Sequence, residues 1–349
     1  DIVRNSFKVY IDQFDPDRVY LLQSEVDPYL NVSPTKMKAI IQQYKNNDFS
    51  AYKDLNQVFE NAIVRARLYR TTLEQQQMNF FKNSGKQATE EEGYLPFART
   101  LDELQARQKQ QLEHFVEVEV SRFGEGLVKK KEAQLISFYD KYLRNQENPY
   151  LFVDANEKPM KAEAKQNIFI MHVIKSIASS LDAHTTFFDQ TEASDLRVRL
   201  EKSIDGVGIV LKQDIDGLII AELLENSPAQ RSGLVKVNDY LVEIDGQKVA
   251  ETSVKEAMRQ LQGKNGTTVS LVLQREIAEG STPTPKVIRL TLKREAITVN
   301  EGRAKASYET FGNGIIGIIR LDSFYQGENG VTSEKDVRDA IAELQQKGN

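Results

Sequence analysis

The chain has 349 residues, more than one typical domain needs, so two or three domains are expected. Its composition, 40% hydrophobic and 28% charged, is typical of a soluble globular protein, and a net charge of −5 without a basic, aromatic-rich stripe argues against a nucleic-acid binder. No apolar run approaches the length of a membrane span, and the absence of cysteine excludes disulfides and cysteine-based metal or nucleophile sites.

The chain begins with a predicted helical domain, residues 1–203. Apolar residues recur at roughly helical spacing from Ile2 to Phe14, and Asp15-Pro16 ends this element. Ser33 before Pro34 predicts an N-cap, and Ser50 predicts the cap of the next helix. Both serines also match the S-x-x-K spacing of penicillin-recognising enzymes. Neither companion motif, S-D-N or K-T-G, occurs in the chain, so N-capping is the better interpretation.

A second helical stretch is rich in Glu, Gln, Lys and Leu and runs from Leu101 to Leu143. It predicts one long helix, or two with a break near Gly124. The segment Val116–Val120 alternates like a strand, but its helical flanks favour a helix. Loops are predicted at residues 83–99 and 145–159.

A further helix is predicted from Lys161 to Leu181, and the sequence SLDAHTTFF follows it at 180–188. Ser180, Asp182 and His184 suggest a catalytic triad, but residues this close in sequence cannot form the relay without extreme backbone strain. His184 is therefore interpreted as a turn residue. The chain has three histidines, none with metal-ligand spacing, so neither a metal site nor a cofactor is predicted.

A β-rich module is predicted over residues 204–295. Its predicted elements are strands at 207–212 and 218–224, a helix from Ser227-Pro228 to Gly233, short strands around Asp245-Gly246, a helix at 254–261, and strands at 267–275 and 287–293. This order of elements resembles a PDZ domain of the type found in bacterial proteases. Asn238 stands where such modules often have glycine, and asparagine tolerates the positive φ that this turn requires.

The sequence GVGIVL, residues 206–211, predicts the binding site of the β-rich module. Two glycines before β-branched residues let backbone N–H groups face outward and form an anion-binding concavity that fits a chain-terminal carboxylate. The resemblance implies that an extended peptide adds as a strand beside Ile209 to Lys212. The predicted peptide-binding residues are Val207, Gly208, Ile209, Val210, Val254, Ala257, Met258 and Leu261. Leu261 is explained at least as well by the core. The apolar set predicts a preference for free, apolar C-termini.

The resemblance extends beyond this module. SLDAHTTFF is similar to the S-L-D-P-H-T-x-[FY] segment of carboxyl-terminal processing proteases, with Ala183 in place of proline. FDPDRVYL at 14–21 and YLPFARTLDEL at 94–104 resemble the helical region of the tail-specific branch of that family. GIIGIIRLDSFY at 314–325 resembles the first strand of the protease core, and a helix at 333–347 matches the next element.

The resemblance implies a multidomain α+β fold: an N-terminal all-helical domain at 1–203, a PDZ domain at 204–295 with a small barrel-like sheet and two helices, and the start of an α/β protease core at 296–349. Such proteases use a serine nucleophile and a lysine base whose pKa is lowered by burial. The resemblance places both beyond Lys347, so no catalytic residue is assigned. Ser323 and Lys335 come nearest to such a catalytic serine and lysine pair within 301–349. This pair is rejected because Lys335 begins a helix that is expected to be exposed.

The predicted function is therefore the recruitment of protein C-termini by part of a tail-specific serine endopeptidase. The alternative is a non-catalytic PDZ scaffold or adaptor. Binding of a C-terminus is expected to move the module through a hinge before Ile204 and a linker at 295–302. The resemblance implies a bacterial periplasmic or envelope setting, and the first residue, Asp1, fits a processed or trimmed product. Protein or peptide C-termini are the expected partners, with neither nucleic acid nor a membrane span, and a homo-oligomer is left open.

Overall fold

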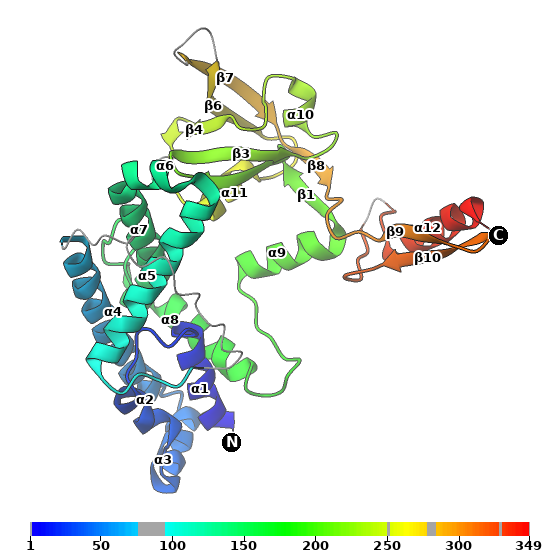
Figure 1. The fold of residues 1–349 in the computed structure, drawn as a ribbon. Helices are drawn as coiled ribbons and strands as arrows, with labels where there is room; N and C mark the ends of the chain where they lie inside the picture. The colour runs from blue at the N-terminus through cyan, green and yellow to red at the C-terminus, as the bar shows by residue number, and fades with distance from the viewer. Residues whose placement is uncertain (1, 76–94, 250–251, 278–283, 328–329, 349) are drawn as a thin grey trace. The chain divides into compact units, whose positions relative to one another are not determined.

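The computed structural model describes residues 2–75, 95–249, 252–277, 284–327 and 330–348 (Figure 1). The chain divides into two compact units, residues 1–189 and residues 190–349. The first unit is helical, and the second contains all the strands named among the described residues.

The helical unit, residues 1–189, has its elements close to the predicted positions. They are α1 (Ile2–Phe14), α2 (Gln23–Leu30), α3 (Pro34–Lys45), α4 (Ser50–Gln75), α5 (Leu101–Phe123), α6 (Glu125–Lys130), α7 (Glu132–Leu151) and α8 (Ala162–Ala178). The segment Val116–Val120 is helical, as its flanks indicated. The predicted break lies at Gly124, whose φ of +84° separates α5 from α6.

Of the two predicted serine caps, one is confirmed and one is wrong. The Ser33 hydroxyl accepts the N–H of Lys36 at 3.3 Å at the start of α3. Ser50 is instead the first residue of α4, and its own N–H donates to Asp48 Oδ1 at 2.9 Å. The carboxylate of Asp48 takes over the capping position because a negative charge is favoured at a helix N-terminus.

The predicted loop at 145–159 is wrong in its first half, because α7 continues through Pro149 to Leu151. Two neighbouring side chains hold this last turn: Glu147 binds arginines from α4, and Asn148 Nδ2 donates to Asp154 O at 3.0 Å. Of the loop predicted at 83–99, residues 95–99 are not helical, and 83–94 lie outside the described residues.

The core of the helical unit is aromatic. Phe7, Tyr10, Tyr52 and Phe59 are fully buried, and Phe59 stacks on Phe14 with ring centroids 4.2 Å apart. Stacked and edge-to-face ring pairs add to the free energy that burial of their area supplies. These rings join α1 to α4 and define the packing of the unit.

A buried charge network joins α4 to α7. Glu147 is 2% exposed and accepts hydrogen bonds from Arg70 Nη1 at 2.8 Å, Arg70 Nη2 at 3.0 Å, Arg67 Nε at 2.7 Å and the Tyr20 hydroxyl at 2.8 Å. Arg70 also donates to Asp140 at 2.7 Å. Burial would raise the pKa of Asp140, but the hydrogen bonds from Arg144 and Arg70 lower it below the usual range. Asp140 is therefore ionised at neutral pH.

His172 on α8 makes the stability of the helical unit depend on pH. Its ring stacks on Tyr150 at 4.5 Å, and its Nδ1 has no hydrogen-bond partner among the described residues. Burial, helped by the charge of Lys175, lowers its pKa to about 4. The unfolded chain titrates near pH 6.5, so below that pH the unfolded form binds more protons.

We therefore expect the free energy of unfolding to fall as pH drops from about 6.5 to about 4, by at most about 3 kcal/mol from this group. Denaturant unfolding of the wild type and of His172→Phe across this range measures the effect. The phenylalanine variant should lose less stability on acidification, because the carboxylates titrate equally in both proteins. Parallel pH curves for the two proteins would contradict the prediction.

The second unit, residues 190–349, contains the β-rich module and the segments that flank it. Its elements are α9 (Gln190–Glu201), β1 (Ser203–Gly206), β2 (Ile209–Asp214), β3 (Gly217–Leu223), α10 (Pro228–Ser232), β4 (Tyr240–Ile244), β5 (Gln247–Lys248), α11 (Val254–Leu261), β6 (Thr268–Ile277), β7 (Thr284–Lys293), β8 (Glu295–Thr298), β9 (Lys305–Phe311), β10 (Gly314–Arg320) and α12 (Ser333–Lys347). The predicted elements of the module are all present.

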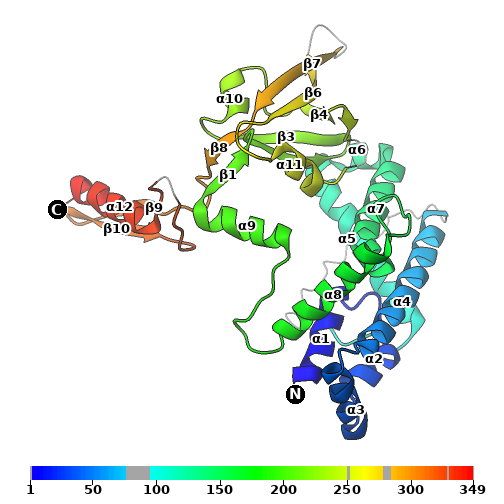
Figure 2. The same ribbon diagram turned by 180° about the vertical axis from the view of Figure 1, so that it is seen from behind.

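The main sheet of the module is antiparallel, with strand order β2-β3-β4-β6-β7 and β5 paired to β4. Its apolar face packs against α11, which contacts β2. Figure 2 shows α11 next to this sheet. Asn238 has a φ of +71°, as expected for the turn before β4. Within this sheet β2 is an edge strand, so one side of its backbone faces away from β3.

The chain enters and leaves the module through a second, two-stranded sheet. β1 pairs with β8, and the register joins Ser203 to Thr298 and Gly206 to Glu295. The predicted linker at 295–302 is therefore wrong over its first four residues, which form a strand. Burial of Ile297 accounts for the pairing, because its side chain lies in the interior while its neighbours face outward.

The last segment is a hairpin of β9 and β10 with α12 against it. The strand predicted to begin at Gly314 and the helix predicted at 333–347 are both present. β9 was not predicted, because its residues are all exposed and lack an apolar pattern. Arg303, which precedes β9, binds α12 through Asp336: its Nε donates to Oδ2 at 2.7 Å and its Nη2 donates to Oδ1 at 2.6 Å.

Candidate functional site

The free edge of β2 offers backbone groups to a ligand. The N–H of Leu224 donates to Gly208 O at 2.8 Å, which makes Ile209 and Leu223 a non-hydrogen-bonded pair. The N–H and C=O of Ile209 therefore point away from β3. The N–H of Leu211 also points away from β3 and donates to Met258 Sδ at 3.3 Å. An added strand would find these groups between β2 and α11.

The loop before β2 directs two further N–H groups outward. The carbonyl of Val207 accepts the N–H of Ala229 at 3.0 Å, and the carbonyl of Gly208 accepts Leu224. In a trans peptide the N–H points opposite to the C=O, so the N–H groups of Gly208 and Ile209 face away from these internal partners. Two adjacent outward N–H groups form the concavity that a carboxylate needs.

Gly208 is required at this position for two reasons. Its φ is +75°, and a Cβ placed on it would lie 2.1 Å from the Cβ of Ser227. Ser227 is buried, and its hydroxyl caps α10 by accepting the N–H of Gln230. The loop therefore rests directly on the start of α10.

The other element of the predicted binding site is α11, which lies against β2 and begins with Ser253 accepting the N–H of Glu256 at 3.2 Å. Of the predicted groove residues on this helix, Ala257 and Leu261 are buried in the core of the module. Val254 and Met258 are half-buried and pack against that core from the groove side. On β2 and its loop, Val207 and Ile209 are buried, and Val210 is half-buried.

Arg294 is a supporting residue that the sequence did not reveal. It is buried between β7 and β8 and donates to the carbonyls of Gln260 at 2.8 Å and Leu261 at 3.3 Å. The N–H of Gly263 donates to Asp205 O of β1 at 3.2 Å. Hydrogen bonds thus join the C-terminal end of α11, and the loop after it, to β1 and to the residue before β8. No local pattern could have identified Arg294, because its partners lie more than 25 residues away.

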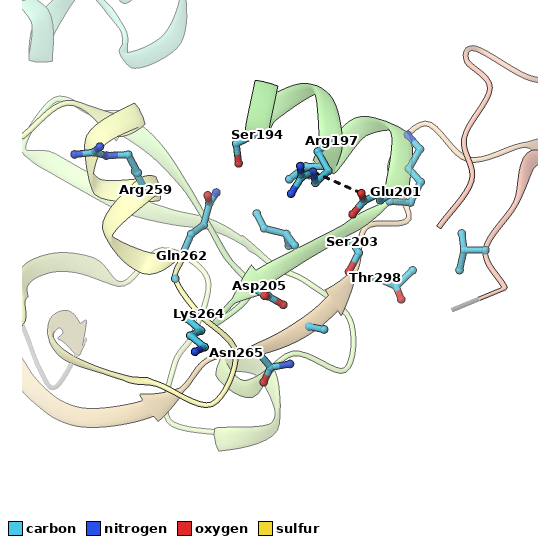
Figure 3. A pocket seen from close by; sticks show the side chains of 16 residues that line it. Ser194, Arg197, Glu201, Ser203, Asp205, Arg259, Gln262, Lys264, Asn265 and Thr298 are labelled. Carbon is cyan, nitrogen blue, oxygen red and sulfur yellow. Dashed lines mark ion pairs between the residues drawn. The ribbon is translucent and has the colours of Figure 1, made fainter. Parts of the chain in front are cut away.

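A polar hollow of about 740 Å³ lies between α9, β1 and the loop after α11 (Figure 3). Arg197 and Glu201 of α9 form an ion pair there at 3.7 Å, and Lys264 and Asn265 approach from the loop. Its charged and amide side chains contrast with the apolar side chains of the predicted peptide-binding set. This hollow is therefore separate from the predicted apolar site.

The sequence around His184 forms a turn. Asp182 Oδ1 accepts the N–H groups of His184 at 2.7 Å and Thr185 at 2.8 Å, and the Thr185 hydroxyl donates to Oδ2. The hydroxyl of Ser180 donates a hydrogen bond to Ser176 O at 2.5 Å. Ser180 and Asp182 thus form hydrogen bonds with the backbone, and His184 lies in a turn, as predicted for that residue.

Two kinds of feature are absent from the part of the chain that the structure describes. Within it, no cluster of three or more His, Cys, Asp or Glu side chains is arranged to hold a metal ion. No helix there combines the length and the apolar character needed to cross a bilayer.

Comparisons with known proteins agree with this arrangement. Residues 1–191 match the family described as the tail specific protease N-terminal domain, and residues 197–274 match the PDZ domain family. These matches confirm the predicted fold class of a helical N-terminal region followed by a PDZ domain with its sheet.

Individual relatives include the carboxy-terminal processing protease CtpA of Bacillus subtilis, 30% identical over 50% of this chain and 34% of that protein. The tail-specific protease of Haemophilus influenzae is 25% identical over 47% of this chain and 24% of its own length. A solved PDZ domain of a carboxy-terminal protease from Vibrio cholerae, in complex with a peptide, is 25% identical with a TM-score of 0.23, covering 27% of this chain and 97% of that one. The chain spans between about a quarter and a third of the two curated relatives named.

Proposed function

Because the chain belongs to the tail-specific protease family, we propose that it recruits proteins by their free C-termini for cleavage by a serine endopeptidase. The observation that supports this best is the pair of outward N–H groups at Gly208 and Ile209, placed at the start of the open edge of β2. A peptide would add antiparallel to β2, with its terminal carboxylate on these N–H groups.

The walls of the groove support a preference for apolar C-terminal side chains. Val207, Ile209, Val254 and Met258 offer no polar side-chain partner except a thioether. A charged terminal side chain would lose its hydration there without compensation, so it would be disfavoured. The predicted binding set, Val207, Gly208, Ile209, Val210, Val254, Ala257, Met258 and Leu261, is retained in this proposal, with Ala257 and Leu261 supporting the wall from the core.

In this proposal the chain is the substrate-recruiting portion of the enzyme, with a helical domain at 1–203, a PDZ domain at 204–295 and the start of a protease core at 296–349. No residue of this chain is assigned the role of the catalytic serine or of the neutral lysine. Ser323 and Lys335 are both exposed, so they do not form the buried pair that such a mechanism needs. The relatives named are bacterial, and a periplasmic or envelope setting is part of the proposal.

The proposal is tested by comparing the affinities of two peptides that differ only in a free or an amidated C-terminus. We expect a fluorescent peptide with an apolar, free C-terminus to bind this chain at least about tenfold more tightly than the same peptide with an amidated C-terminus, because the amide loses a charge-assisted hydrogen bond. Fluorescence anisotropy measures both affinities. Equal affinities would refute the carboxylate site, and no binding of either peptide would refute recruitment through this groove.

A further inference from the structure

Met258 places the only sulfur atom of the β-rich module at the peptide-binding edge. It is the single methionine among residues 204–295, and its Sδ accepts the N–H of Leu211 at 3.3 Å. Leu211 lies two residues after Ile209, on the same free edge of β2. The thioether thus stands where a carbonyl of an added peptide strand would accept that N–H.

The contact makes Met258 a displaceable occupant of the groove. A thioether is a weak acceptor, and an unbranched side chain with three rotatable bonds leaves its position at little cost. The side chain is half-buried, so part of it is reachable from solvent. A peptide carbonyl is the stronger acceptor and replaces the sulfur when a strand adds to β2.

We propose that the peptide-binding groove is redox-sensitive, and that oxidation of Met258 by a peroxide closes it to C-terminal peptides. This inference rests on the proposed function of the same groove. A sulfur lone pair attacks one oxygen of the peroxide, the O–O bond breaks and an S–O bond forms. With hydrogen peroxide the other oxygen leaves as water, so the sulfur is oxidised by two electrons and the peroxide is reduced.

The sulfoxide changes both states of the groove. Its oxygen is a strong acceptor and holds the N–H of Leu211 more firmly than the thioether does, so the ligand-free form is stabilised. It also places a polar group against the apolar side chains of an incoming C-terminus, which disfavours the bound form. Both effects weaken binding, and together we expect a loss of about tenfold in affinity.

The experiment treats the whole chain with hydrogen peroxide and follows the sulfoxide at Met258 by mass spectrometry of a proteolytic digest. Anisotropy with the same apolar, free-acid peptide should show about tenfold weaker binding after oxidation, and methionine sulfoxide reductases should restore it. The matched control is Met258→Leu, whose affinity for the peptide, whatever its value before treatment, should not change on exposure to peroxide. Unchanged affinity of the oxidised wild type, or continued sensitivity of the leucine variant, would overturn the proposal.

A second measurement does not depend on peptide binding. In the ligand-free protein, the backbone amide of Leu211 should exchange with deuterium more slowly, and shift in an amide NMR spectrum, once Met258 is oxidised. If the peptide does not bind even before oxidation, the proposed function fails, while this amide still reports on the contact. An amide of Leu211 that does not respond to oxidation would refute the closure on its own.

Discussion

Gly208→Val is expected to weaken binding of a free-acid C-terminal peptide at least about a hundredfold. The Cβ would lie 2.1 Å from Ser227 Cβ and 2.6 Å from its Oγ, and a β-branched residue is strongly disfavoured at a φ of +75°. The loop must move, and the N–H groups of Gly208 and Ile209 then lose their shared direction. Loss of two charge-assisted hydrogen bonds corresponds to about 3 kcal/mol, or about a hundredfold.

A milder pair of variants separates the loop geometry from general unfolding. Gly208→Ala should lose most of the binding, because alanine meets the same collision with Ser227. Adding Ser227→Gly removes the colliding atoms and should recover part of the affinity, less the strain of about 1 kcal/mol that alanine retains at positive φ. Circular dichroism should show the helical unit still folded in all of these proteins. Full binding by Gly208→Val would contradict the carboxylate loop.

Glu147→Ala is expected to lower the free energy of unfolding of the helical unit by about 3 kcal/mol, because it leaves the buried guanidinium of Arg70 and the half-buried one of Arg67 short of a partner. The loss lies at the lower end of the range for buried pairs. Arg70 keeps Asp140 at 2.7 Å, and Arg67 keeps Glu157 at 3.0 Å. Urea denaturation followed by circular dichroism measures the change.

Glu125→Ala is the matched control for this network. Glu125 pairs with Lys129 in the same unit, but both side chains are more than half exposed, so the loss should stay below about 1 kcal/mol. Glu147→Gln should fall between the two, because it keeps the shape and the hydrogen-bond acceptor but removes the charge. Similar losses for Glu147→Ala and Glu125→Ala would show that the buried network contributes no more than a surface pair.

Much of the second unit could be predicted because its signals are local. Glycine at 208, the Ser227-Pro228 helix start and the apolar stripe from Val254 to Leu261 each act within a few residues, and the structure contains the corresponding turn and helices. The direction of the Gly208 N–H group followed from the same local pattern. The outward N–H groups agree with this pattern, and their role in peptide binding stays a proposal.

The rest depended on contacts between distant segments. The pairing of β1 with β8 joins residues about ninety positions apart. Neither short segment carries a sequence pattern that predicts pairing with the other. α7 passes through Pro149 because Glu147 is held by arginines of α4, a tertiary effect that outweighs the local preference of proline. Met258 was expected in the groove, but its bond to Leu211 could be found only in three dimensions.

The antiparallel pairing of Ser203 with Thr298 also bears on how such a module can be carried by different chains. Cα atoms of paired residues in an antiparallel ladder lie about 5 Å apart. The whole intervening segment therefore behaves as an insertion whose two ends meet at one point. A chain that carries this module could lose it, with a tight turn joining the two ends, or gain it at such a turn. The peptide-binding module could therefore be replaced while the rest of the chain keeps its fold.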